Sequence, residues 1–455
     1  MSTATDAARV DATPTVGVQP LVGPYRGYAM SLLLSISIVN YLDRQVVHIL
    51  AEPIKNDLHL HDWQLGLLTG LAFGVLYTFL GLPIARLAER GNRPMIIATA
   101  AAVWSGFTVL CGLVHNFWQL ALARVGVGVG EAGCTPPAHS LILDYTSPEK
   151  RSSALAFYGL GPPLGGLIGM AFGGVVADAF GWRMAFLMAG APGLVFAVLT
   201  ALTLKEPRRM LARQAEKAKA TTASLGEMFK LISGKRAYWI LGAAITCNVF
   251  IAHGHGPFLG SFYLRNHADG LAQMAQATGD LFGVKLGSVG FLGIALGLLS
   301  GLGGAVGTWT GGQLADRFGA ADPRRYLLMP GVAILICVPL FAGALLTPSL
   351  PLSLALFGLN YLVGFTWYGP AFTAWFALVP AHMRATNSAL ILFVSNLIGL
   401  GLAPLGVGIL SDVYGASMGS GEGIRWALVT LTSVGVLTGV LFLLATRSFR
   451  QEIES

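Results

Sequence analysis

Four ionisable residues lie inside long apolar runs of the sequence. Asp43 and Arg44 are neighbours in one run, and Arg124 and Glu131 stand seven residues apart in another. An ionisable side chain at membrane depth costs several kcal/mol unless it is paired or hydrated, so each of these residues is a functional candidate. A carboxyl group that pairs with an arginine can also take up a proton and release that arginine. These residue types therefore indicate ion pairing, proton binding and recognition of a charged group.

Helix geometry predicts which of the four residues meet. The first run ends near Leu50, which places Asp43 about 10 Å from that end at about 1.5 Å per residue. The run that begins near Trp118 crosses in the opposite direction, so Arg124 lies at nearly the same depth, and we predict an ion pair between Asp43 and Arg124. Glu131 lies two turns deeper on the same helix face, and Arg124 is its nearest cation. We predict that protonation of Asp43 or Glu131 frees Arg124, so these three residues form a proton-coupling group; for Asp43, the alternative is a static ion pair that only fixes helix packing.

The elements that must hold these residues are membrane-spanning helices. Hydrophobic residues make up 54% of the 455 positions and charged residues 11%, whereas soluble globular proteins carry about 25% charged residues. The charges stand between apolar runs of about 20 residues, the length that crosses a hydrocarbon core. Twelve such runs begin near residues 28, 64, 95, 118, 152, 183, 236, 285, 326, 351, 384 and 424. The predicted fold class is an all-α membrane protein with twelve transmembrane helices.

The loop charges predict the orientation. Most Lys and Arg residues stand in alternate loops, with the longest basic loop near the middle of the chain. Because cations gather in cytoplasmic loops, we predict that both termini are cytoplasmic. The Ala-, Gly- and Arg-rich composition indicates a bacterial inner (plasma) membrane. The predicted domains are a disordered N-terminus 1–27, a six-helix bundle 28–204, a cytoplasmic linker 205–235, a second six-helix bundle 236–446 and a cytoplasmic tail 447–455.

Several function classes are excluded. The net charge of +7 lacks the basic face interleaved with aromatic residues that a nucleic-acid surface requires, so no nucleic-acid partner is expected. The four cysteines have no metal-ligand spacing, and we expect no metal site and no cofactor. No nucleotide-binding loop or nucleophile triad is visible, so we do not expect an enzyme.

An internal repeat divides the chain into two halves. ARLAERGNRP at 85–94 corresponds to GQLADRFG at 312–319, and KRSSAL from Lys150 corresponds to MRATNSAL from Met383. Such repeats place a substrate site at their interface, near the bilayer midplane. Glycines also recur every four residues in the second, fifth and eighth runs, and close helix packing at the boundary between the halves is expected there.

These loops carry a family resemblance. The pattern G-x-L-A-D-R-x-G, intact from Gly312 to Gly319, resembles the signature loop of the major facilitator superfamily. The resemblance implies two pseudo-symmetric six-helix bundles and alternating access. The first copy departs from the pattern, with Ala85 for glycine and Glu89 for aspartate. An acid beside a helix terminus and its flanking arginines can latch two helices in one conformation. The predicted gating residues are Glu89, Arg90, Arg93, Asp316 and Arg317.

Three further segments resemble the Spinster family of sphingolipid and lysolipid transporters. They are SIVNYLDRQVVHILAEPI in the first run, RVGVGVGEAGCTPPAHSLILDY in the fourth and FYGLGPPLGG in the fifth. An N-Y-x-D-R stretch also occurs in organic-anion symporters of the same superfamily. The resemblance implies a lysophospholipid or sphingolipid-like substrate.

The two halves differ in chemistry. The tenth run has no charge and is rich in aromatic residues, which contrasts with the charged first half. One charged wall facing one aromatic wall suits an amphiphile with a charged head and a hydrocarbon tail. The predicted substrate-binding residues are Arg44, Tyr41, Arg124, Glu131, Tyr158, Trp367 and Tyr368.

Three functions stay open at this point. The first is secondary transport of an amphiphilic, lipid-like substrate, with protons and the lipid bilayer as the other partners of a monomer. The second is a proton-coupled symporter or antiporter of a small organic anion or drug. The third is a receptor or sensor built on this fold, which lacks support from a soluble signalling domain.

Overall fold

The computed structural model describes residues 24–147, 150–207, 225–319, 322–380 and 383–454. Every regular element in these residues is a helix. The first half consists of α1 (Pro24–Leu58), α2 (Asp62–Thr69) continued by α3 (Leu71–Arg90), α4 (Arg93–Cys111), α5 (Phe117–Glu131) continued by α6 (Thr135–Tyr145), α7 (Arg151–Tyr158) continued by α8 (Gly161–Phe180), and α9 (Trp182–Thr203).

The second half repeats this order. It consists of α12 (Arg236–Asn266), α14 (Ser288–Gly319), α15 (Arg325–Leu346), α16 (Leu350–Gly364) continued through the short helix η2 (Phe365–Trp367) by α17 (Tyr368–Ala377), α18 (Arg384–Ser395) continued through the π-helix η4 (Asn396–Leu402) by α19 (Ala403–Met418), and α20 (Ser420–Glu454). The twelve predicted helical spans are confirmed. Two shorter helices, α11 (Leu225–Ser233) and α13 (Ala268–Phe282), were not predicted. The predicted disordered segment lies, up to residue 23, outside the described residues.

Ten of the twelve spans are recognised by length and hydropathy alone within the described residues. The other two are α1, which carries Asp43 and Arg44, and the α5–α6 pair, which carries Arg124 and Glu131. The break between α5 and α6 follows Glu131 directly, because Pro136 and Pro137 begin α6 and a proline cannot donate the helical hydrogen bond. The corresponding span of the second half changes to a tighter helix at Phe365–Trp367. Breaks at matching places show the repeat in the structure.

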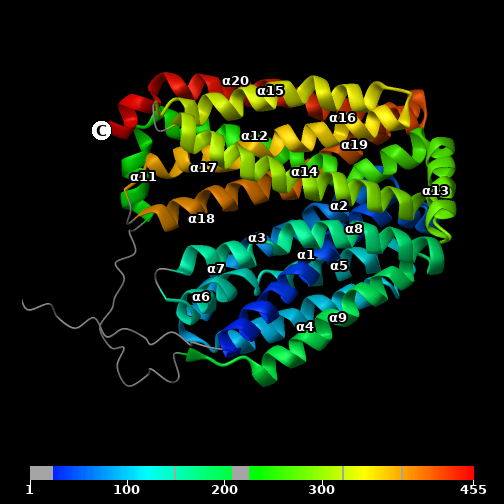
Figure 1. Cartoon of the computed structure of the whole chain (residues 1–455), viewed down its shortest axis with the longest axis horizontal. Helices are drawn as coiled ribbons and strands as arrows, with labels where there is room; N and C mark the ends of the chain where they lie inside the picture. The colour runs from blue at the N-terminus through cyan, green and yellow to red at the C-terminus, as the bar shows by residue number, and fades with distance from the viewer. Residues whose placement is uncertain (1–23, 148–149, 208–224, 320–321, 381–382, 455) are drawn as a thin grey trace, which may run out of the picture.

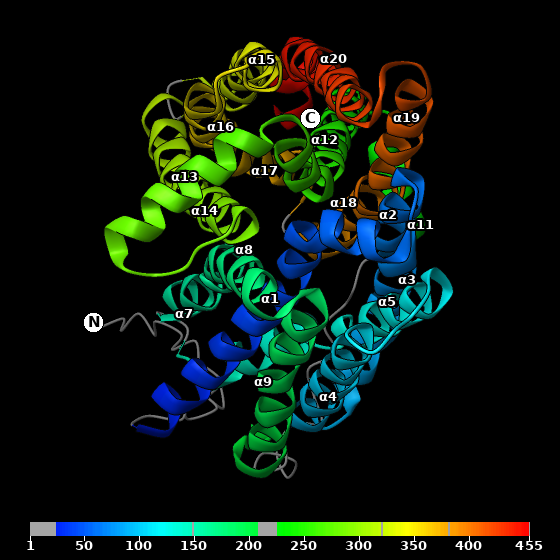
Figure 2. The ribbon, with the colours of Figure 1, turned by 90° about the vertical axis from the view of Figure 1, so that its right-hand side faces the viewer.

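The two halves lie side by side, with their spans roughly parallel (Figure 1). One end of the molecule carries α11 and the C-terminal end of α20, and we call it the linker end. The opposite end carries α13 and the start of α2, and we call it the α13 end. Viewed from the α13 end, the helices of each half form a separate bundle (Figure 2).

Glycines make the contact between the halves very close. A Cβ atom at Gly66 of α2 would lie 2.2 Å from the carbonyl oxygen of Pro404 in α19, and one at Gly293 of α14 would lie 2.2 Å from that of Met170 in α8. No side chain fits at either position, as the glycine pattern predicted. The pattern in α8 was interpreted wrongly, however. A Cβ atom at Gly165 would meet the carbonyl oxygen of Ile38 in α1, so that stripe packs inside the first half.

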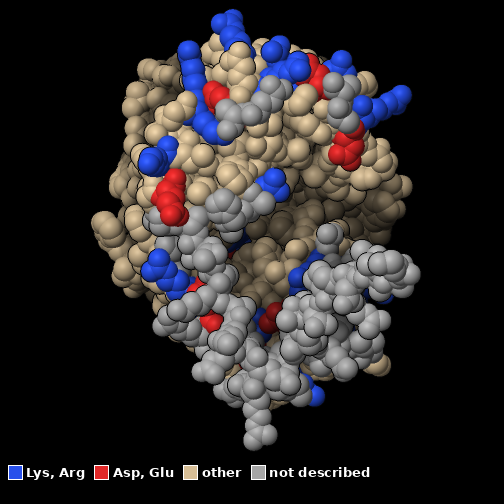
Figure 3. Space-filling model, turned by 90° about the vertical axis from the view of Figure 1, so that its left-hand side faces the viewer, with Lys and Arg blue, Asp and Glu red and all other residues tan. Residues whose placement is uncertain are grey.

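The surface at the linker end is hollowed between the two halves (Figure 3). Lys and Arg side chains surround this hollow, while few Asp and Glu side chains are visible on the same face. The molecule is therefore open at the linker end, and its contacts between halves lie toward the α13 end.

Candidate functional site

The centre of the site is an ion pair between Arg44 of α1 and Glu131 of α5. The Nε atom of Arg44 lies 2.5 Å from Oε2 of Glu131, and the glutamate side chain is fully buried. Three aromatic rings surround the guanidinium, with its Cζ atom 5.1 Å from the ring centre of Tyr41, 4.8 Å from Phe73 and 4.6 Å from Tyr77. A cation over aromatic faces is stabilised by the ring quadrupoles. The three rings and the single ionic partner, Glu131, together hold the guanidinium of Arg44 in place.

The predicted ion pair between Asp43 and Arg124 is wrong, as is the expectation that Arg124 is the nearest cation to Glu131. Asp43 is buried and its Oδ2 atom accepts a hydrogen bond of 2.9 Å from Oγ1 of Thr108 in α4. Its Oδ1 atom has no hydrogen-bond partner. Successive residues point about 100° apart on a helix, so Asp43 faces α4 while Arg44 faces α5. Depth along the membrane was considered in the prediction, and direction around α1 was not.

Arg124 is buried without a direct ionic partner among the described residues. Its guanidinium lies over Phe73, with Cζ 5.1 Å from the ring centre, and its Nε atom donates no hydrogen bond. Phe73 thus contacts both buried arginines. Arg124 is still close enough to act electrostatically on both Asp43 and Glu131. The four charges form one cluster of two cations and two carboxyl groups.

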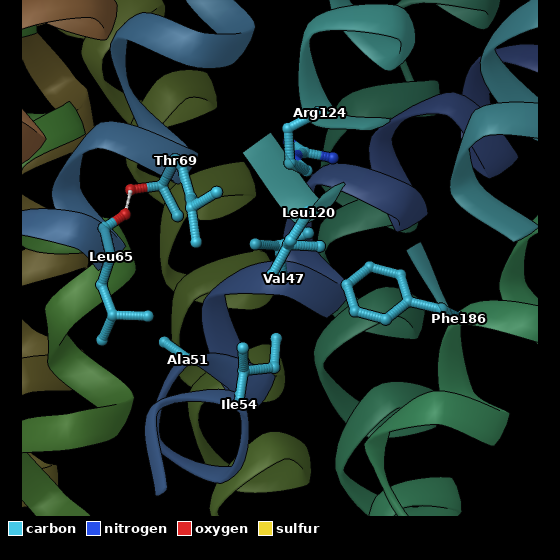
Figure 4. A pocket seen from close by; sticks show the side chains of 9 residues that line it. Val47, Ala51, Ile54, Leu65, Thr69, Leu120, Arg124 and Phe186 are labelled. Carbon is cyan, nitrogen blue, oxygen red and sulfur yellow. Dashed lines mark hydrogen bonds between the residues drawn. The ribbon is translucent and has the colours of Figure 1, made fainter. Parts of the chain in front are cut away.

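A small closed cavity lies beside Arg124, toward the α13 end. Its volume is about 10 Å³. Apart from Arg124 and Thr69, the side chains that line it are apolar (Figure 4). Thr69 donates its hydroxyl hydrogen bond to the carbonyl oxygen of Leu65. Val47, Leu120 and Phe186 close the space. These apolar side chains lie between the charge cluster and the α13 end.

Two further predicted residues of the first half lie close to the cluster. Tyr41 contacts Arg44 as described, and its Cβ atom packs beside Gly165 of α8. Tyr158 of α7 is buried in a hydrophobic cluster with residues of α1 and α6, and its ring meets that of His139 at 5.3 Å. Tyr158 is therefore part of the packing between α1, α6 and α7.

The two predicted aromatic residues of the second half differ in position. Trp367 is buried and packs near Phe442 of α20, inside the core of the second half. Tyr368 is 51% exposed, and its ring packs against Phe372 at 4.8 Å. Of these two residues, Tyr368 is the exposed one.

Three of the predicted gating residues, Arg93, Asp316 and Arg317, form no ion pair between the halves among the described residues. Arg93 is fully buried and pairs with Asp144 at 2.6 Å and with Glu206, all within the first half. Asp316 and Arg317 of α14 are exposed and form no ion pair with the residues that the structure describes. The remaining two are Glu89, which is exposed, and Arg90, whose side chain lies outside the described part of the structure. The charge of Arg93 is satisfied inside the first bundle in this conformation, and its gating role stays a prediction.

The halves are held together at the α13 end by an ionic group that the sequence analysis missed. Arg265 of α12 lies 2.7 Å from carboxylate oxygens of both Glu52 in α1 and Asp62 in α2. Lys55 lies 2.6 Å from Asp62, and Ser411 of α19 donates a hydrogen bond of 2.6 Å to the same carboxylate. We call these five residues the Arg265 cluster. It joins both halves through side chains that are largely buried.

Two carboxylates strengthen this contact at helix N-termini. Asp412 of α19 accepts hydrogen bonds from the backbone nitrogens of Asp62 and Trp63, at the start of α2. Asp178 of α8 accepts one of 2.6 Å from the backbone nitrogen of Gly290, at the start of α14. The positive end of a helix dipole favours such anions. The two contacts occupy equivalent positions in the repeat, and each crosses between the halves.

Comparison with known proteins agrees with this architecture. Residues 33–404 match the family model of the Major Facilitator Superfamily. The chain belongs to the major facilitator superfamily. It is therefore a multi-pass membrane protein and a secondary transporter, and not an enzyme.

Within the superfamily, the chain resembles the Spinster proteins. A bacterial homologue of the human lysosomal transporter Spinster, solved in an inward-facing and unoccupied conformation, matches with a TM-score of 0.83 and 31% identity over 95% of this chain and 99% of that one. Protein spinster homolog 1 of Xenopus tropicalis is 28% identical over 90% of this chain and 79% of its own length. An MFS-type efflux pump of Mycolicibacterium smegmatis is 31% identical over 95% of both chains.

Proposed function

We propose that this transporter moves an amphiphilic, lipid-like molecule of the lysophospholipid or sphingolipid type by alternating access. The observation that carries the proposal is the difference between the walls of the two halves. The first half presents the pair of partly exposed Arg44 and buried Glu131, while the second half presents Tyr368 and Phe372 without a charge in α16 or α17. A charged head fits the first wall and a hydrocarbon tail fits the second.

The charge cluster supports proton coupling through a simple balance. Arg44 and Arg124 carry two positive charges, and ionised Asp43 and Glu131 carry two negative charges, so the cluster is neutral. An anionic headgroup would leave one uncompensated negative charge in a site of low polarity, which is costly. Uptake of one proton by Asp43 or Glu131 restores neutrality. Binding of an anionic amphiphile therefore favours binding of a proton.

Arg44 is the group that we propose exchanges partners. Its guanidinium can bind a phosphate through two parallel hydrogen bonds, as it binds a carboxylate. A headgroup phosphate would replace Glu131 on Arg44, and Glu131 would then accept the proton. The aromatic rings of Tyr41, Phe73 and Tyr77 keep the guanidinium in place during the exchange.

The present conformation supports a site that opens toward the cytoplasm. The hollow lies at the linker end, where many Lys and Arg side chains gather, and the Arg265 cluster closes the α13 end. Cations concentrate on the cytoplasmic side, so we propose that the linker end is cytoplasmic. The likeness to the inward-facing bacterial homologue supports the same orientation. Both termini would then be cytoplasmic, in a bacterial inner membrane, with the protein acting as a monomer.

In the opposite conformation the linker end must close. We propose that Glu89, Arg90, Asp316 and Arg317 then meet across the halves, and that the Arg265 cluster separates. The two ends would thus exchange their ionic contacts during each cycle.

A second function has one specific observation in its favour. The relative from Mycolicibacterium smegmatis is named an efflux pump, which fits antiport of a drug or a small organic anion. A site for a small anion would be expected to place cations on both walls, and α16 and α17 of the second half contain none. The amphiphile remains the better match to both walls.

The direct test is to identify what the purified protein retains. Native mass spectrometry in a mild detergent should reveal a bound lipid, and added lysophospholipid should displace it. The Arg44→Ala variant should lose the retained lipid. Absence of bound lipid together with tight binding of a small polar acid would favour the second function instead.

A further inference from the structure

Helix α13 lies across the ends of the spanning helices. It connects α12 to α14 and runs nearly perpendicular to both (Figure 1). Viewed from the α13 end, its C-terminal part projects beyond the side of the second bundle (Figure 2). The helix is therefore placed over the edge of the protein, where the membrane begins.

The helix has one apolar and one polar face. Leu271, Ala275 and Gly279 are buried and follow one another at intervals of four residues, so they share one face. The opposite face consists of the exposed polar residues Asp269, Gln273, Gln276 and Asp280. The apolar face thus points toward the bundle and the membrane, and the polar face points away from them.

The apolar face continues after the bundle has ended. Phe282 follows Leu271 by eleven residues, which is close to three full turns at 3.6 residues per turn, so both side chains point the same way. Leu271 is fully buried, whereas Phe282 is 72% exposed. Leu281 and Val284 beside it are 78% and 55% exposed. The protein covers the first part of this face and leaves the last part uncovered.

The depth of α13 relative to the membrane indicates what covers the uncovered part of its apolar face. The neighbouring spans α12 and α14 have 31 and 32 residues, which corresponds to roughly 45–50 Å at 1.5 Å per residue and exceeds the hydrocarbon core of about 30 Å. Their ends therefore reach the headgroup layer, where α13 crosses. A helix that lies in this layer with its apolar face toward the acyl chains is a stable interfacial arrangement.

We propose that Leu281, Phe282 and Val284 insert into the lipid leaflet at the α13 end and anchor the second half there. We call these three residues the α13 tip. Lys285 follows directly and is exposed, so its ammonium group can meet lipid phosphates beside the inserted side chains. Because α13 connects α12 to α14, the anchor belongs to the second half.

Site-directed spin labelling of the full chain in liposomes tests the anchor. Phe282→Cys carries the label at the tip, and Gln276→Cys carries it on the polar face as the matched control. Both variants are made with Cys247 and Cys337 replaced by serine, because those thiols are only partly buried. Both labelled positions are exposed, so the fold should tolerate the changes.

We expect the label at position 282 to collide with dissolved oxygen at least several times more often than with a water-soluble nickel chelate. The label at position 276 should show the reverse preference. Equal access of both labels to the nickel chelate would overturn the proposal. Spin–spin broadening at position 282 would overturn it as well, because a second copy of the chain would then cover the tip.

Discussion

At the residue scale, Arg44 is the best-connected member of the charge cluster. It pairs with Glu131 and contacts three aromatic rings, whereas Arg124 contacts one ring and has no direct ionic partner among the described residues. A substrate anion can therefore approach Arg44 only in competition with Glu131. That competition is the step at which we place the proton.

The Glu131→Gln variant tests this step. Without the carboxylate the cluster carries one extra positive charge, so an anionic amphiphile should bind without a proton. We expect its dissociation constant to be independent of pH, while that of the natural protein should rise by up to about tenfold per pH unit above the range in which the proton binds. Binding of a fluorescent lysophosphatidylglycerol, whose phosphodiester keeps one negative charge throughout, measures both between pH 5.5 and 8.5.

Glu131→Asp is the control, because it keeps a titratable carboxyl group at the same position. It should retain a pH-dependent affinity. A Glu131→Gln protein with the same pH dependence as the natural one would show that the proton binds elsewhere.

Asp43 is the other carboxyl group to which the proton is assigned. If it binds the proton, Asp43→Asn should make uptake into proteoliposomes insensitive to a pH gradient. Thr108→Val removes only the hydrogen bond to Asp43 and should leave that sensitivity in place. Unimpaired, gradient-driven uptake by Asp43→Asn would leave Asp43 with a structural role through its hydrogen bond from Thr108.

The sequence located the members of the cluster correctly but not their pairs. All four charges stand out because each interrupts an apolar run, which is a local signal. The pairing depends on the direction of each side chain around its helix and on the break after Glu131, which are set by packing. Phe73, Tyr77 and Thr108 gave no signal, because aromatic residues and threonines are common in membrane helices; only the placement of α3 and α4 beside α1 reveals them.

At the element scale, the contacts between halves depend on glycines with no room for a side chain. A Cβ atom at Gly408 of α19 would lie 2.3 Å from the carbonyl oxygen of Asp62, whereas one at Gly406 of the same helix would meet nothing within 4 Å. Gly408→Ala should therefore disfavour closure of the α13 end by about 1–3 kcal/mol. Gly406→Ala is the matched control and should have no effect.

Distances between spin labels on the two halves at the α13 end would measure this shift. We expect a longer-distance population to appear in Gly408→Ala and to be absent from Gly406→Ala. Identical distance distributions for the two variants would show that the close contact of α2 with α19 does not hold the α13 end closed.

The Arg265 cluster makes an independent contribution to the same closure. Removing the cation in Arg265→Gln leaves Glu52 without its ionic partner and Asp62 with Lys55 as its one cation, which should weaken the closed α13 end by about 2–5 kcal/mol. A cysteine introduced on the side of the Arg265 cluster that faces the charge cluster should then react faster with a membrane-impermeant thiol reagent added from the α13 side. An unchanged reaction rate would mean that the cluster is not a latch.

The elements themselves were largely predictable. The length of the apolar runs predicted the twelve spans, and the repeated signature loop predicted the two halves. The Arg265 cluster could not be predicted from the sequence, because its members come from four separate helices and share no local pattern. The partners of Arg93 were not predicted for the same reason, because Asp144 and Glu206 are remote from it in sequence.

At the scale of the whole molecule, the structure combines an open linker end with a closed α13 end. The closed end contains the Arg265 cluster, the two carboxylates at helix N-termini and the close glycine contacts, and it lies beyond the charge cluster. The site is thus reached from one side, and a full cycle requires this set of contacts to break. A proton and an amphiphile that bind together at the charge cluster are the ligands that we propose drive that change.

Uptake of a labelled anionic lysophospholipid into proteoliposomes, with a pH gradient imposed in either direction, tests this most directly. We predict that flux increases when protons and substrate move down their gradients together, decreases when the pH gradient is reversed, and becomes insensitive to the gradient in Glu131→Gln or Asp43→Asn. Lack of lysophospholipid flux while a small organic anion is carried, or flux that ignores the pH gradient in the natural protein, would contradict the proposed function.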